Sequence, residues 1–154
     1  MLLVRLRSEI ENELESLSRL TNDLVDCEEV GTTSVVMRAK ASIFHDFYTG
    51  VERIFTKIAA ELNGGIPNTP QWHADLLRDM CLNLEGIRPP VITKEMCDSL
   101  LPFLRFRHLF HNMYGFCLDP PRIGELGEAF SEVQQAFLSE MSEFMSWLRE
   151  MSKL

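Results

Sequence analysis

Apolar residues recur every three or four positions along most of this chain, and this spacing constrains the fold more than any other feature. The clearest run lies near the carboxyl end, at Leu126, Phe130, Val133, Phe137, Met141, Phe144, Leu148 and Met151. Such spacing keeps one face of an α-helix buried. No segment shows the period-two alternation, bounded by turn residues, that a half-buried strand needs. The sequence therefore predicts an all-α protein.

Capping residues, glycines and prolines divide this pattern into about five predicted helices. Their expected ranges are about 2–29, 34–62, 70–85, 93–114 and 119–154. Pro102 falls inside the fourth range, where we expect a kink or a break, because proline lacks a backbone donor and its ring clashes with the preceding turn. The first two helices are long and are joined by a short loop, which predicts an up-and-down helical bundle.

The chain has the length of one domain, so we expect a single helical domain over residues 1–154. Its apolar runs are far shorter than the ~20 residues that a membrane span needs. Charges at Arg5, Arg7 and Glu9 interrupt any secretory signal, and the four cysteines stand singly, without metal-ligand spacing. We therefore expect a cytoplasmic protein with ordinary buried thiols, no metal site and no membrane segment.

The formal net charge of −8 argues against a general nucleic-acid coat protein, because such proteins neutralise phosphates with many Lys and Arg side chains. The charge is unevenly distributed. Residues 1–30 hold eight acidic residues against three arginines, whereas residues 99–118 hold no acidic residue, two arginines and two histidines. If the protein contacts RNA, we expect the contact at residues 99–118, here called the acid-free segment.

The acid-free segment also concentrates the potential catalytic groups. On a helix, Arg107, His111 and Tyr114 share one face because they stand at i, i+4 and i+7. The flanking faces carry Arg105, His108 and Asn112. Histidine can transfer a proton to or from RNA while a guanidinium stabilises the charged phosphate, so the two suit RNA cleavage without metal. Spacing alone favours a plainer interpretation, in which the histidines and arginines are ordinary helix residues.

This segment resembles the R-x4-H-x-Y signature of HEPN-type ribonuclease toxins of the HepT family. The similarity covers about residues 35–125 and includes Pro70, Trp72-His73, Leu76-Leu77, Arg88-Pro89, Phe106-Arg107-His108 and Leu118-Asp119-Pro120. The resemblance implies a HEPN-like helical bundle and a metal-independent RNA endonuclease, without a cofactor, that leaves a 2′,3′-cyclic phosphate. It also implies a homodimer whose paired faces line one groove. The implied partner is a minimal nucleotidyltransferase antitoxin that transfers AMP from ATP to the motif tyrosine.

Alignment to this signature puts Asn112 where the family has its histidine. Four residues separate Arg107 from Asn112, and one residue separates Asn112 from Tyr114. The resemblance therefore assigns Arg107 as catalytic, Asn112 as the occupant of the acid/base position and Tyr114 as the AMP acceptor. An amide does not titrate near neutral pH, so this copy is weakened or inactive unless His111 replaces the missing imidazole.

Two other alignments make His111 the catalytic histidine, one counted from Arg107 and a looser one counted from Arg105. Neither leaves a tyrosine two positions further on. Arg105 and His108 lie on the faces beside Arg107, and with Arg107 as the catalytic arginine they are the expected RNA contacts.

Two residue pairs elsewhere allow functional interpretations that the sequence does not favour. Trp72 and His73 fit a ligand site, but a tryptophan in the first turn of a short helix more often packs against its neighbours. His45 and Asp46 fit a proton-transfer pair, but their place near the edge of a buried face favours a solvated pair. For the whole chain two hypotheses remain: an RNA endonuclease toxin, or a non-catalytic helical binding partner of a minimal nucleotidyltransferase.

Overall fold

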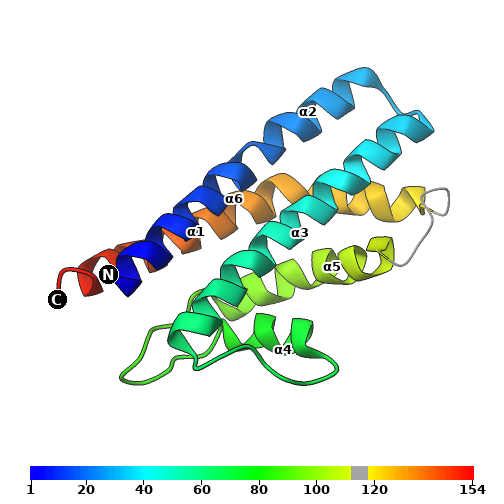
Figure 1. Ribbon diagram of the computed structural model, residues 1–154. Helices are drawn as coiled ribbons and strands as arrows, with labels where there is room; N and C mark the ends of the chain where they lie inside the picture. Colours follow the sequence, from blue (N-terminus) through cyan, green and yellow to red (C-terminus); the bar gives the residue numbers. More distant parts are fainter. Residues whose placement is uncertain (112–117) are drawn as a thin grey trace.

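The computed structural model describes residues 1–111 and 118–154, apart from the side chain of His111. Over these ranges the chain forms six helices (Figure 1). They are α1 (Leu2–Ser18), α2 (Leu20–Val30), α3 (Ser34–Leu62), α4 (Trp72–Asp79), α5 (Lys94–His111) and α6 (Pro120–Met151). Within the same residues there is no strand, only an isolated bridge between Leu84 and Arg88. The predicted all-α class is confirmed.

Four helical rods form the body of the molecule, and they alternate in direction along the chain (Figure 1). α1 and α2 together make the first rod, and α3, α5 and α6 make the others. α1 packs on α3 and α6, while α5 also packs on both α3 and α6. The short α4 contacts α3 and α5 from outside these rods. This arrangement is the predicted up-and-down bundle, with both termini at one end.

The first rod is not the single helix that we predicted for residues 2–29, because it is interrupted at Arg19. Gln134 of α6 reaches the chain at this point. Its Nε2 donates to the carbonyl oxygen of Leu17, and Thr21 donates its hydroxyl hydrogen to Gln134 Oε1. In a continuous helix the Leu17 carbonyl would accept from the backbone N–H of Thr21. The buried glutamine uses this acceptor instead, which satisfies its own amide in the core.

The helix predicted for residues 70–85 is α4, and it ends earlier than predicted, at Asp79. The buried guanidinium of Arg88 donates to the carbonyl oxygens of Asp79 and Leu82, both at 3.0 Å. It also donates to Asn63 Oδ1, at 2.8 Å, just after α3. The Asp79 carbonyl also accepts from the backbone N–H of Leu82 in a turn, and neither carbonyl takes part in a continuing helix. Arg88 thereby fixes the segment between α3 and α5, which contains α4.

α5 continues through Pro102, so the predicted break is absent. Proline provides no N–H for the carbonyl of Asp98, one turn earlier. Both residues are exposed, so this carbonyl lies on the solvent side and the buried side of the helix is kept. The acid-free segment is therefore helical as far as His111. Its predicted extension through Tyr114 lies outside the described residues.

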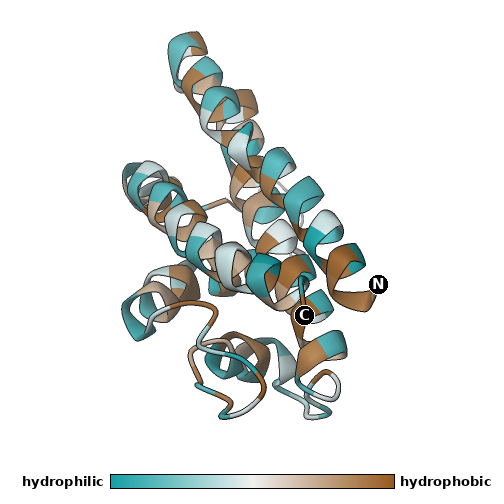
Figure 2. Ribbon diagram, turned by 90° about the vertical axis from the view of Figure 1, so that its left-hand side faces the viewer, coloured by the Kyte–Doolittle hydropathy of each residue, from teal (hydrophilic) through white to brown (hydrophobic). Residues whose placement is uncertain are grey.

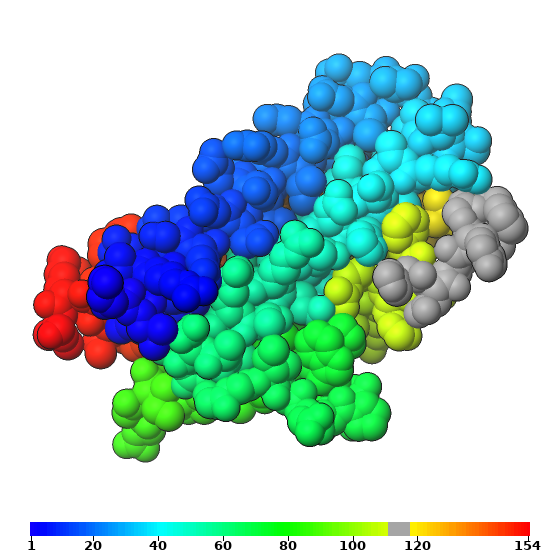
Figure 3. All heavy atoms as spheres, in the orientation of Figure 1, coloured from blue at the N-terminus to red at the C-terminus, as the bar shows by residue number. Residues whose placement is uncertain are grey.

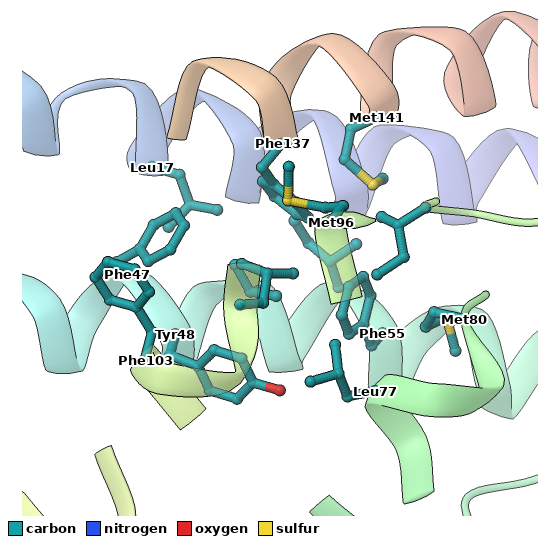
Figure 4. Close-up of a cluster of buried hydrophobic side chains, with 14 of the residues drawn as sticks. Leu17, Phe47, Tyr48, Phe55, Leu77, Met80, Met96, Phe103, Phe137 and Met141 are labelled. Atoms are coloured by element: carbon teal, nitrogen blue, oxygen red, sulfur yellow. The ribbon is translucent and has the colours of Figure 1, made fainter. Parts of the chain in front are cut away.

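A group of aromatic side chains from α3, α5 and α6 lies within a core that also holds many aliphatic and methionine side chains (Figure 4). Phe47 is central, because its ring lies edge-on to those of Phe103, Phe130 and Phe137 at centroid separations of 5.3, 5.2 and 6.2 Å. All four rings are buried. Edge-to-face contacts add about 0.5–1.5 kcal/mol each to the burial of apolar area. The apolar stripes that predicted the helices therefore meet in one core.

The helices turn their polar sides to solvent, as the alternation of brown and teal along the ribbons shows (Figure 2). None of the helices described here has an apolar stretch long enough to cross a membrane. Cys27, Cys81 and Cys97 are free thiols, and Cys97 is buried. Cys117 lies outside the described residues.

α1 and α3 approach each other closely where Gly50 faces Leu17. A Cβ added at Gly50 would lie 2.5 Å from Leu17 Cδ2, and Leu17 is itself buried. We predict that Gly50→Ala lowers the free energy of unfolding, because overpacking costs about 1–3 kcal/mol and alanine gains only about 1 kcal/mol over glycine in a helix. Gly124→Ala in α6 is the matched control. Nothing lies within 4 Å of its added Cβ, so it should raise the melting temperature. Equal thermal shifts for the two variants would contradict the close approach.

Candidate functional site

Glu52 places a carboxylate on the buried side of α3. It lies one helical turn after Tyr48, and the exposed fractions of the two residues are 7% and 0%. Burial raises the pKa of the Tyr48 phenol, and the nearby Glu52 carboxylate raises it further, so the phenol stays neutral. A buried carboxylate is costly unless it is paired and hydrogen-bonded. The fold must therefore bring a cation to this part of α3.

Arg107 of α5 supplies that cation. Its Nη1 lies 2.9 Å from Glu52 Oε1, and its Nη2 donates to Oε2 at 3.1 Å. Two contacts between a planar guanidinium and a carboxylate fix orientation as well as charge. The guanidinium carbon also lies 5.6 Å from the centre of the Tyr48 ring, within the range of a cation–π contact. Arg107 is thus held by Glu52 on one side and by an aromatic face on the other.

His73 of α4 completes the group, which we call the Glu52 cluster (Glu52, His73 and Arg107). Its Nδ1 lies 2.7 Å from Glu52 Oε2 and 2.9 Å from Arg107 Nη2. The His73 ring stacks on that of Trp72, with centroids 3.6 Å apart. The last turns of α5 reach the surface between α3 and α4, so three helices meet at the cluster (Figure 3).

A pocket of about 170 Å³ opens at this cluster, lined by His45, His73, Arg107 and His108. We call it the imidazole pocket. His45 comes from α3. The centroids of its ring and the Phe110 ring are 5.2 Å apart, and its Nδ1 lies 3.5 Å from Asp46 Oδ1. Imidazoles exchange protons near neutral pH, and a guanidinium stabilises negative charge. The pocket therefore holds the group types that acid–base chemistry on a phosphate ester requires.

Arg107 and Glu52 also line a second pocket, of about 560 Å³, with Thr49, Arg53 and Lys57 among its other residues. Arg53 is exposed, and Lys57 Nζ lies 3.5 Å from Glu9 Oε2. Arg107 is therefore shared between the imidazole pocket and a surface of α3 that carries two further cations. The carboxylates of Glu13 and Glu52 line the same pocket, so its charge is mixed.

The sequence-predicted site residues fall into three groups. The structure brings Arg107 and His108 together in the imidazole pocket. It does not bring Arg105 there: Arg105 is two residues before Arg107, about 200° around the helix, and it lines a different pocket with Arg122. His111 is the last residue of α5, and its side chain is not among those described. Asn112 and Tyr114 lie outside the described residues.

Sequence reasoning missed Glu52 and favoured simple packing for His73. A signal was present at Glu52, because a charged residue one turn after Tyr48 interrupts an apolar stripe and requires a buried partner. His73 gave no comparable signal. Its neighbour Trp72 does pack against it, as expected, but the contacts of the imidazole with α3 and α5 depend on how α4 is placed. In the His45–Asp46 pair, the Asp46 side chain is exposed to solvent, as expected. The His45 side chain also lines the imidazole pocket.

A comparison with protein families matches residues 39–148 to the family described as HepT-like protein. No curated protein and no solved structure matches the chain. The matched range includes most of α3 and α6 and all of α4 and α5, but neither α1 nor α2. It therefore contains the whole Glu52 cluster.

We predict that Glu52→Ala and Arg107→Ala each lower the free energy of unfolding by about 3–5 kcal/mol, because each leaves the other charge buried and unpaired. The double variant should cost less than the sum of the two, with a coupling of about 0.5–3 kcal/mol in a denaturant-unfolding cycle. Arg53→Ala is the control, since this exposed neighbour should change stability by less than about 0.5 kcal/mol. Additive effects of Glu52→Ala and Arg107→Ala would show that the pair does not form.

Proposed function

The chain belongs to the HepT-like protein family, and on that premise we propose that it is the RNA-cleaving toxin of a two-component toxin–antitoxin system. The proposed reaction is an attack of the ribose 2′-oxygen on the adjacent phosphate, which leaves a 2′,3′-cyclic phosphate and a free 5′-hydroxyl. The reaction needs proton transfer and stabilisation of a charged phosphate, and it needs no metal in this proposal.

The observation that carries this proposal is the imidazole pocket. Arg107, the arginine of the family signature, lines this pocket with three imidazoles, those of His45, His73 and His108. Arg107 and His108 belong to the acid-free segment, which lacks the carboxylates that repel RNA over much of this acidic chain. We further propose a homodimer, because two copies of this segment would give a stronger positive potential than one.

The second candidate function is a non-catalytic binding partner of a minimal nucleotidyltransferase. Two observations favour it. Asn112 cannot titrate near neutral pH, and the charge of Arg107 is already paired with Glu52. The two candidates differ in one measurable property, because only the toxin cleaves RNA.

We predict that the purified chain cleaves RNA in the presence of a metal chelator, and that Asn112→His raises the rate by about 10²–10⁴, the usual contribution of one positioned acid or base. Arg107→Ala should abolish cleavage. The measurement is the rate of cleavage of one labelled RNA at equal protein concentration, with analysis of the product ends.

His111→Ala is the companion variant for this series. If Asn112→His gains nothing while His111→Ala abolishes cleavage, His111 is the catalytic histidine and our alignment is wrong. If RNA binds to the present chain and to Asn112→His but neither of them cleaves it, the toxin function is wrong and the binding-partner function replaces it.

We also propose that the antitoxin is a minimal nucleotidyltransferase that transfers AMP from ATP to Tyr114. The added phosphate is negative and would repel RNA from the site. Intact-mass spectrometry after incubation with the antitoxin and ATP should show an AMP adduct that Tyr114→Phe removes. The chain has two tyrosines, and Tyr48 is fully buried, so Tyr48→Phe should leave the adduct unchanged. An adduct that persists in Tyr114→Phe contradicts the assignment.

A further inference from the structure

The two ring nitrogens of His73 have different surroundings. Nδ1 lies 2.7 Å from Glu52 Oε2 and 2.9 Å from Arg107 Nη2. Nε2 makes no hydrogen bond to the residues that the structure describes. About a third of the side chain, 34%, is exposed, and the ring lines the imidazole pocket. The imidazole is therefore held in place through Nδ1, and the rest of the ring is partly accessible from the imidazole pocket.

The contact with Glu52 decides which nitrogen carries the proton. A neutral imidazole has one N–H, so Nδ1 either donates to the carboxylate or accepts from the guanidinium. An unprotonated Nδ1 would put two acceptor atoms 2.7 Å apart. Arg107 Nη2 points an N–H toward Nδ1 at 2.9 Å and loses this acceptor when Nδ1 is protonated, but it keeps Glu52 Oε2 at 3.1 Å, and the shorter contact of Nδ1 is the one with the carboxylate. Nδ1 therefore carries the hydrogen, and Nε2 carries the lone pair.

This arrangement is the one that prepares a histidine as a base. A carboxylate that accepts from Nδ1–H fixes the tautomer and the ring orientation, and it stabilises the imidazolium that forms when Nε2 takes a proton. The stack with Trp72 restricts the ring further. Arg107, in the same cluster, is placed to stabilise negative charge on a phosphate next to that base.

We propose that His73 is a catalytic residue of the RNA cleavage reaction and that Glu52 is its positioning residue; this inference rests on the function proposed above. His73 Nε2 takes the proton of the 2′-hydroxyl as O2′ forms its bond to phosphorus. The bond from phosphorus to O5′ breaks, and O5′ takes a proton from water. His73 then returns its proton to the solvent, which restores the neutral ring.

The proposal gives a role to α4 that the family signature does not include. In the signature, arginine and histidine stand on one helix, but Asn112 occupies the histidine position here. An imidazole from α4 would supply the proton transfer that the amide cannot. Arg107 then cooperates with a residue 34 positions away in sequence, whose ring nitrogen lies 2.9 Å from its guanidinium.

The first test uses His73→Asn, which keeps an N–H donor for Glu52 but cannot act as a base near neutral pH. We expect cleavage to fall by about 10²–10⁴, with RNA affinity and melting temperature close to those of the unchanged chain. The residual cleavage by His73→Asn should also differ from cleavage by the unchanged chain in its dependence on pH, because the asparagine does not exchange a proton. The control is Arg78→Gln, an exposed position of the same helix that should leave the rate unchanged.

The outcomes of this test separate the two proposals. If His73→Asn cleaves at the unchanged rate with an unchanged pH profile, the role of His73 is wrong and the ribonuclease function stands. If the unchanged chain binds RNA and does not cleave it, the ribonuclease function is wrong and the catalytic step falls with it.

The second test does not depend on RNA. The ¹⁵N chemical shifts of the histidine rings distinguish the two neutral tautomers, and the chain has only four histidines to assign. We expect the Nδ1–H form for His73 at neutral pH, and a shift toward the Nε2–H form in Glu52→Gln. An Nε2–H form in the unchanged chain would overturn the proposed role of Glu52, whether or not RNA is cleaved.

Discussion

The carboxylate of Glu52 determines how the site is arranged. Because it is buried, the fold is stable only if a cation reaches it, and Arg107 of α5 does so. The same oxygen that accepts from Arg107 also lies beside His73 of α4. Three helices are therefore joined through one charged group. The aromatic side chains around Phe47 set the spacing between α3 and α5. The Glu52 cluster determines which polar atoms of the two helices face each other.

Much of the fold was predictable because helical periodicity is local. Each apolar stripe must be buried, and short loops make neighbouring rods antiparallel. The errors have a different origin. The interruption at Arg19 depends on Gln134, which is distant in sequence, and the early end of α4 depends on Arg88, nine residues after Asp79; both side chains donate to backbone carbonyls. A local pattern contains no information about such donors, so the sequence indicated longer helices than the structure has.

The candidate site was predictable only in part. Arg107 and His108 follow from the spacing of charged residues on one helix, and the structure brings both to one pocket. The roles of Asn112, His111 and Tyr114 remain predictions. His73 could not be found from spacing, because its contacts require the placement of α4 against two other helices.

Gln134 has a further consequence for how the rods align. The stripe on α6 is apolar from Leu126 to Leu148, so sliding α6 by one turn against α1 would still place apolar side chains against apolar side chains. Such a slide would also move the buried amide away from the Leu17 carbonyl and leave both without partners, at a cost of about 1–3 kcal/mol for each group. A single polar side chain in an apolar seam thus sets the register of the bundle, as buried asparagines do in coiled coils.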